Sequence, residues 1–123
     1  KFQAPDTVAD CSLHGALLVG PQLPLPLLGS DVATALETFT VALSCDGRLA
    51  ETGKGSNVLG SPVAAIAHLL SVLANQPDSM PLQAGEIVTT GTITTAQSVR
   101  PGEIWRSEIQ GIALSGLTLE FLA

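Results

Sequence analysis

Hydroxyl groups and a glycine gather at one place in this sequence, the run Thr89-Thr90-Gly91-Thr92. Threonine hydroxyls and the uncovered backbone N–H of a glycine are hydrogen-bond donors, and such donors at the end of a strand can receive a carboxylate or an enolate oxygen. The run follows the β-branched pair Ile87-Val88, which is typical of a strand. An ordinary exposed strand rich in threonine explains the same pattern, and the pattern alone favours that interpretation.

Other groups that could do chemistry are scattered. His14 and His68 are the only two histidines, and no paired spacing indicates a zinc site. Asp10, Ser12 and His14 have the residue types of a nucleophilic triad, but alternate residues of one short segment cannot converge as a triad does. Asp6 and Asp10 could bind a hard cation, although loop aspartates more often form caps and turns.

Composition narrows the class of protein. The chain has 123 residues, of which 46% are hydrophobic and 13% charged, and its formal net charge is −6. This composition predicts one folded domain over residues 1–123. Five Lys and Arg in scattered positions cannot form the basic face of a nucleic-acid-binding module, nor a patch for a membrane surface. So few charges also predict that a partner chain covers part of the surface.

The cysteines and the hydropathy of the chain indicate the expected cellular location. Cys11 and Cys45 are expected to be buried thiols of a reducing compartment, and a single disulfide bridge is the alternative. The apolar stretch over residues 15–29 is interrupted by three prolines, so no segment is expected to span a bilayer. The N-terminus has no signal-peptide pattern, and a cytoplasmic location is expected.

Strands are predicted in several segments. Alternation predicts a strand over residues 35–45, and Asp46-Gly47 is a strong type I′ turn signal after which the chain returns antiparallel. A short buried strand is expected over residues 16–20. Beyond residue 82 the sequence reads as successive strands, with turns at Ala84-Gly85 and Pro101-Gly102.

One helix is predicted, over residues 62–75. Ser61 suits the N-cap and Pro62 the first helical position. Apolar residues at helical spacing form one face, which predicts packing against a sheet. Asn75 is expected to take the left-handed cap conformation, and Pro77 is expected to end the helix. The predicted fold is therefore mainly β with one central helix, an α+β domain.

Three segments, which together cover nearly the whole chain, carry a resemblance to a known family. They are Asp6–Gly20, Gly55–Ala74 and Leu82–Phe121. Their order and spacing resemble the C-terminal half of the 2-keto-4-pentenoate hydratases (2-hydroxypenta-2,4-dienoate hydratases). These enzymes belong to the fumarylacetoacetate hydrolase superfamily, as do the 4-oxalocrotonate decarboxylases. The resemblance implies the mixed, mostly antiparallel β-roll of that superfamily's C-terminal domain.

The resemblance also implies a chemistry. In the family a magnesium or manganese ion, held by acidic side chains, chelates the 2-keto acid end of the substrate. The dienol is tautomerised, and water then adds across the far double bond. The family's metal-binding glutamates precede the matched region, so this chain is expected to contribute no metal ligand and no cofactor, and to be inactive alone.

The same resemblance suggests site residues and partners. Thr90, Gly91 and Thr92 match a segment that helps to wall the substrate carboxylate site. The run from Cys11 to His14 departs from the family, since relatives commonly read Asn-Ala-Ser-Ser there, but Ser12 and His14 are further candidates for the pocket lining. The expected partners are a small 2-keto acid and either a second copy of the chain or a separate N-terminal half. A decarboxylase and a non-catalytic binding or assembly domain remain alternatives.

Overall fold

The computed structural model describes residues 3–9 and 14–122, so the predictions for Asp10, Cys11 and Ser12 lie outside the described residues. The elements in chain order are α1 (Ala4–Ala9), the 3₁₀ helix η2 (Leu25–Leu28), α2 (Val32–Thr38), β1 (Thr40–Cys45), β2 (Arg48–Lys54), the 3₁₀ helix η3 (Gly55–Asn57), α3 (Pro62–Ala74), β3 (Ile104–Gln110) and β4 (Thr118–Glu120).

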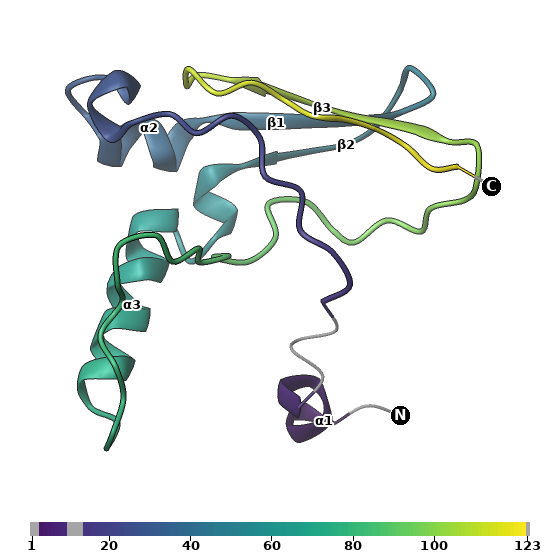
Figure 1. Ribbon diagram of the computed structural model, residues 1–123. Helices are drawn as coiled ribbons and strands as arrows, with labels where there is room; N and C mark the ends of the chain where they lie inside the picture. Colours follow the sequence, from purple (N-terminus) through teal and green to yellow (C-terminus); the bar gives the residue numbers. More distant parts are fainter. Residues whose placement is uncertain (1–2, 10–13, 123) are drawn as a thin grey trace.

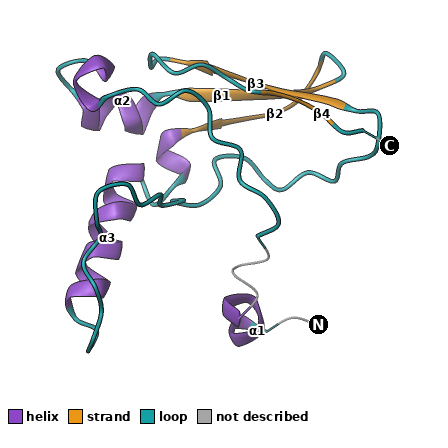
Figure 2. Cartoon of the chain, in the orientation of Figure 1, coloured by secondary structure: helices purple, strands orange, loops and turns teal. Residues whose placement is uncertain are grey.

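The four strands form one antiparallel sheet in the order β2-β1-β3-β4 (Figures 1 and 2). The β1–β2 hairpin closes through Asp46 at φ 48° and Gly47 at φ 76°, and two positive φ angles in a two-residue loop define the predicted type I′ turn. The antiparallel sheet of the predicted α+β fold is therefore confirmed, but the fold is not mainly β, because helices cover more of the described residues than strands do. The prediction of a single helix is wrong, because α1 and α2 are present besides α3.

Helix α2 replaces the first part of a predicted strand. Residues 35–38 are helical and β1 begins only at Thr40. Asp31 caps the helix, since its Oδ1 accepts from the Thr34 backbone N–H at 3.1 Å, and hydrogen bonding from Thr34 lowers the pKa of the Asp31 carboxyl. An aspartate at the N-cap stabilises the first turn of a helix. This local contact outweighs the weak alternation that predicted a strand.

Two other predicted strands are absent among the described residues. Residues 16–20 and residues 87–99 belong to no strand, and β4 covers only three residues of its predicted run. Their β-branched and apolar composition suits a strand, but a strand also requires a partner backbone for its ladder. Within the described residues no backbone partner reaches them.

Helix α3 occupies the predicted residues. The Ser61 hydroxyl accepts from the Val63 backbone N–H at 3.2 Å, and Pro62 lies in the first turn, as predicted. The prediction for Asn75 is wrong, because its φ is −103°. Instead, Asn75 Nδ2 donates to the Ser71 carbonyl at 2.7 Å, so its side chain satisfies one of the last carbonyls of the helix.

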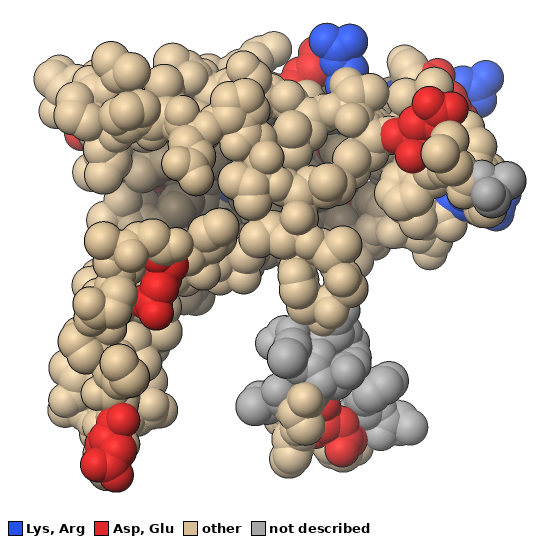
Figure 3. All heavy atoms as spheres, viewed as in Figure 1, with Lys and Arg blue, Asp and Glu red and all other residues tan. Residues whose placement is uncertain are grey.

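The predicted packing of α3 against the sheet is also wrong. The helix points away from the sheet (Figure 1), and none of its residues is buried. Val63, Leu70 and Val72 are among its exposed side chains. Figure 3 shows this arm as largely uncharged surface. The apolar face that periodicity predicted is present, but no sheet of the described chain covers it.

The stretch Gly55–Ala74 is apolar enough to be considered as a membrane span, with 20 residues and a mean hydropathy of 1.6. It is not one continuous helix, however. Leu59 at φ 50° and Gly60 at φ 85° separate η3 from α3. The 13 residues of α3 rise about 20 Å, whereas a hydrocarbon core is about 30 Å thick. Helix α3 by itself is therefore too short to cross a bilayer.

The core is small. Only three described apolar side chains are buried: Phe39, Val58 and Trp105, which are 6%, 4% and 8% exposed. The accessible surface is 9194 Å². A compact monomer of 12.6 kDa would expose about 6,200 Å². Roughly 3,000 Å² of additional surface is thus open, which is more than the ~800 Å² that one partner buries in an interface of standard size.

Candidate functional site

The inner face of the sheet is defined by the register of its strands. Residues directly opposite each other in antiparallel strands share a face. One row consists of Gly53, Val41 and Ile109 on β2, β1 and β3, and the next row consists of Glu51, Leu43 and Ser107. Trp105 lies on this same face, and its burial marks it as the inner one.

The predicted site residues lie in a segment that passes below β2 in Figure 1. We call residues 87–99 the tethered segment and Thr90–Thr92 within it the threonine elbow. No backbone–backbone hydrogen bond holds the tethered segment among the described residues. Side chains hold it instead, and they come from β2 and η3.

The threonine elbow itself is open. Thr90 is half-buried, whereas Gly91 and Thr92 are exposed. Gly91 has φ 108°, a conformation that favours glycine, and no atom lies within 4 Å of the position that a Cβ would take. Among the described residues, neither threonine hydroxyl has a hydrogen-bond partner. These donors are therefore available to a ligand, while Ser12, the fourth candidate, lies outside the described residues.

The first tether lies one residue beyond the elbow. Asn57 Nδ2 in η3 donates to the Ile93 carbonyl at 2.8 Å. Ile93 also covers Gly53, since a Cβ at Gly53 would lie 2.7 Å from Ile93 Cγ2 and closer still to the Ile93 carbonyl oxygen. The absence of a side chain at residue 53 lets the segment approach the sheet.

The second tether is the Glu51 carboxylate on β2. Its Oε2 accepts from the Thr95 backbone N–H at 3.1 Å, from Thr95 Oγ1 at 2.6 Å and from Gln97 Nε2 at 3.0 Å. The hydrogen bond from the Thr95 hydroxyl lowers the pKa of Glu51 by more than partial burial raises it. Glu51 is therefore ionised at neutral pH and is a poor proton donor.

An apolar groove lies on the same face of the sheet, on the other side of Val41. It has a volume of about 530 Å³ and is lined chiefly by uncharged side chains of the segment before η2 and of the β3–β4 region, among them Leu23, Ile109 and Leu117. It contains no Asp, Glu, Lys or Arg. Two strand spacings, about 10 Å, separate Ile109 from Gly53 beneath the tethered segment.

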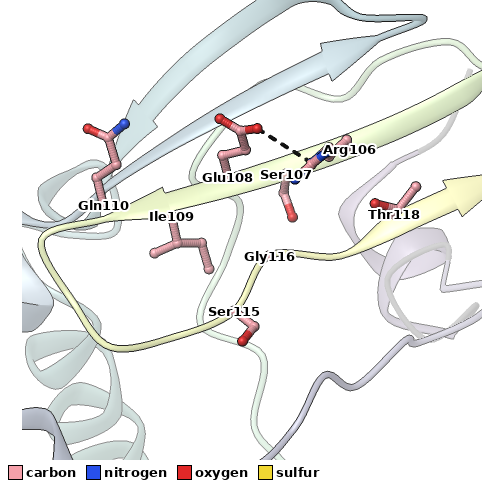
Figure 4. A pocket seen from close by; sticks show the side chains of 8 residues that line it. All are labelled: Arg106, Ser107, Glu108, Ile109, Gln110, Ser115, Gly116 and Thr118. Atoms are coloured by element: carbon pink, nitrogen blue, oxygen red, sulfur yellow. Dashed lines mark ion pairs between the residues drawn. The ribbon is translucent and has the colours of Figure 1, made fainter.

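A second hollow of about 450 Å³ follows the border between β3 and the turn that leads into β4 (Figure 4). Ser107 and Ile109 point to one side of β3, and Glu108 and Gln110 point to the other. The Arg106 Nε to Glu108 Oε1 ion pair, at 3.4 Å, lies on the outer, solvent-facing side. The hydroxyl side chains that line this hollow are Ser107, Ser115 and Thr118, and no histidine lines it.

Metal-ligating residues do not converge. In the part of the chain that the structure describes, no three His, Cys, Asp or Glu side chains come together. Divalent cations of the magnesium class are held by several oxygen ligands. The described residues do not fit such an ion by themselves, so no chemical step is assigned to a metal here.

The cysteine and histidine predictions have a mixed outcome. Cys45 is a free thiol that is half-buried rather than fully buried, and desolvation raises its pKa, with Glu103 and Asp46 adding to the shift. Its predicted neighbour in the alternative bridge, Cys11, lies outside the described residues. His14 and His68 are both exposed.

Sequence reasoning missed Glu51 and Asn57. Glu51 is separated from Thr95 by 44 residues, and Asn57 from Ile93 by 36. No short-range spacing connects such residues. The only local signal in the sequence was the alternation along β2, which places Glu51 and Gly53 on one face of the sheet. It did not indicate which segment would contact that face.

Comparison with known proteins agrees with this architecture. The family described as "Fumarylacetoacetate (FAA) hydrolase C-terminal" matches residues 2–117. A 4-oxalocrotonate decarboxylase from Pseudomonas sp. is 31% identical over 116 residues, covering 91% of this chain and 40% of the relative. A 2-keto-4-pentenoate hydratase from Paraburkholderia xenovorans is 31% identical over 107 residues, covering 87% of this chain and 37% of the relative.

Solved structures give the same result. The 4-oxalocrotonate decarboxylase of Pseudomonas putida G7, complexed with calcium and acetate in one structure and with magnesium and adipate in another, matches with a TM-score of 0.62 at 33% identity. The match covers 72% of this chain and 32% of that protein. The chain thus spans about 40% or less of the length of these relatives. On the match over residues 2–117, the chain belongs to the fumarylacetoacetate hydrolase family, in the part described as its C-terminal region.

Proposed function

We propose that this chain supplies the substrate-carboxylate wall of a hydratase-type lyase that adds water to 2-keto-4-enoic acids such as 2-hydroxypenta-2,4-dienoate, in aromatic catabolism. The observation that carries the proposal is the family match over residues 2–117, together with hydratase relatives at about 30% identity. The open donors of the threonine elbow support it, because a carboxylate requires donors that no other group occupies.

The chemistry available in this chain is binding. The Thr90 and Thr92 hydroxyls and the Gly91 backbone N–H are the groups that would donate to the substrate carboxylate. We infer that the ligand set for a divalent cation, and the group that moves the protons, come from polypeptide outside this chain. The chain alone is then inactive, and a second copy or a separate N-terminal half would cover its roughly 3,000 Å² of additional open surface.

A decarboxylase is the second candidate. It is favoured by the 4-oxalocrotonate decarboxylases among the relatives and by the solved structures that match at 33% identity. A non-catalytic binding or assembly domain is the candidate from another class, and the uncovered α3 face favours it.

Titration of the isotope-labelled chain with 2-oxopentanoate, a saturated 2-keto acid, tests the proposal. We expect the backbone amide of Gly91 and its two neighbours to shift with saturation, while amides of α3 do not. 2-Pentanone, which keeps the keto oxygen but lacks the carboxylate, is the control for nonspecific binding. No shift at the elbow at any concentration of 2-oxopentanoate would refute its role as a carboxylate wall.

The assembly proposal has a separate measurement. Native mass of the purified chain is expected to correspond to a dimer or larger particle. A stable monomer would instead require a different polypeptide to cover the open surface, and adding the N-terminal part of a hydratase relative would then be expected to give a complex with a divalent-cation site and hydratase activity.

A further inference from the structure

The position of the threonine elbow depends on side chains alone. A strand in a sheet is held by backbone hydrogen bonds on at least one side, whereas the tethered segment has none among the described residues. Its contacts with β2 and η3 involve residues 93, 95 and 97. Each of these contacts is made toward β2 or η3, so together they hold the side of the segment that faces these elements.

Glu51 makes most of these contacts. A single oxygen, Oε2, accepts from both the backbone and the hydroxyl of Thr95 and from the Gln97 amide. Gln97 Nε2 also donates to Thr95 Oγ1 at 3.0 Å, which links the two donors to each other. Hydrogen bonds to an ionised acceptor are stronger than neutral ones. Removal of the carboxylate would therefore release both residues together.

The elbow lies close enough to this point to follow it. Thr92 is three residues before Thr95, and the chain bends at residues 93–94, so the two residues lie at most about 10 Å apart along the chain. On the N-terminal side, the nearest backbone hydrogen bond is that of Glu86 to the Gln83 carbonyl at 3.2 Å, in the turn before the segment. Between that turn and Asn57's contact with Ile93, the elbow has no other attachment through hydrogen bonds in the described chain.

We propose that Glu51 is a positioning residue for the threonine elbow. Its carboxylate holds Thr95 and Gln97 over β2, and it thereby orients the donors of residues 90–92 toward a keto-acid carboxylate. The ligand in this statement rests on the proposed function. The claim that Glu51 holds the tethered segment in place does not rest on it. Ligand binding and the mobility of the segment are measured separately.

Amide hydrogen exchange measures the fixing. In Glu51→Ala the exchange of the Thr95 backbone amide is expected to accelerate about tenfold, the size expected for loss of one charge-assisted hydrogen bond. Amides of β1 should stay within about twofold of wild type. The matched control is Glu108→Gln, which removes a carboxylate on the outer face and should leave Thr95 unchanged.

Two further variants separate positioning from general stability. Glu51→Gln keeps an acceptor oxygen without the charge, so an intermediate acceleration is expected. Thr95→Val removes only the hydroxyl donor. It replaces Glu51→Ala as the test variant if Glu51→Ala does not fold. Unchanged exchange at Thr95 in both Glu51→Ala and Thr95→Val would overturn the proposal, and so would equal acceleration in β1, because that result indicates loss of overall stability.

Ligand binding is the second readout, with 2-oxopentanoate as the probe and the Gly91 amide shift as the signal. Glu51→Ala should require about tenfold more ligand than wild type for half-saturation, the factor that corresponds to about 1.4 kcal/mol, and Glu108→Gln should match wild type. Equal affinity in Glu51→Ala despite faster exchange would overturn the positioning role. Absence of any Gly91 shift in wild type would refute the proposed function, while the exchange rates would still decide whether Glu51 fixes the segment.

Discussion

The sheet and the tethered segment hold their backbones in opposite ways. β1 lies between β2 and β3 and is paired along its whole length with both. Residues 87–99 are richer in β-branched residues than β1, yet within the described chain only two side chains of other elements, Glu51 and Asn57, and the segment's own polar groups hold them. The comparison shows that strand-forming composition produces a strand only where a partner backbone is present. In this chain the unpaired region is also the one that carries the candidate site.

The largest effect is expected from the sheet. Trp105→Ala removes a buried indole whose Nε1 donates to Glu103 Oε2 at 2.9 Å. Such truncations cost about 3–5 kcal/mol, so the unfolding midpoint in urea should fall sharply or the transition should disappear. The exposed Leu122→Ala is the control and should change little. A small effect of Trp105→Ala would mean that the sheet is not the stable part of the molecule.

Gly53→Ala tests the contact between the two regions. A Cβ at residue 53 would collide with the Ile93 backbone, so either β2 or the tethered segment must shift, at about 1–3 kcal/mol. Because the segment lacks a ladder, we expect it to move, with faster exchange at Thr95 and unchanged protection in β1. Gly15→Ala, where no atom lies within 4 Å of the new Cβ, is the matched control. Loss of amide protection in β1 would contradict the prediction that the tethered segment moves and the sheet does not.

Asn57→Ala removes the tether nearest to the elbow. Its hydrogen bond to the Ile93 carbonyl contributes about 1 kcal/mol. The variant should lose that amount in equilibrium unfolding and should broaden the Gly91 amide signal. Asn57→Asp offers no N–H to the carbonyl and should behave like the alanine variant. If Asn57→Asp keeps wild-type stability and Gly91 line width, the amide is not a tether.

Acid should loosen the tethered segment with little effect on the sheet. The folded-state pKa of Glu51 lies below its ordinary value of 4.5, so its stabilising contribution is complete above that pH and is lost as pH falls through the lower, folded value. The Thr95 amide shift is expected to titrate with a midpoint below 4.5 and to lose that titration in Glu51→Gln. A midpoint at or above 4.5 would be inconsistent with three donors on the carboxylate.

How much of the fold and the site could be predicted depended on how far apart in the sequence the interacting residues lie. The turn at Asp46-Gly47 and the N-cap at Ser61 arise from neighbouring residues, and both predictions were confirmed. The start of β1 was misplaced, because the Asp31 cap of α2 was not weighed against alternation. Residue types alone favoured an ordinary exposed strand at the threonine elbow, and its role in carboxylate binding, which the family resemblance implied, remains a prediction. Its tethers could not be found, since Glu51 and Thr95 meet only after the fold has formed.

The β1–β2 turn has a consequence for the order in which the molecule folds. The hairpin joins residues 40–54 through two left-handed residues, and such local structures form within about 1–10 μs. β3 must arrive from much further along the chain, where the Ile104 N–H donates to Asp46 Oδ1 across 58 residues, and closing so long a loop has a higher entropic barrier. During synthesis and refolding, the edge of β1 that pairs with β3 therefore remains unpaired until β3 docks. The carboxylate of Asp46, at the end of the hairpin, is an acceptor for the first residue of β3 and so helps to set the register of that late strand.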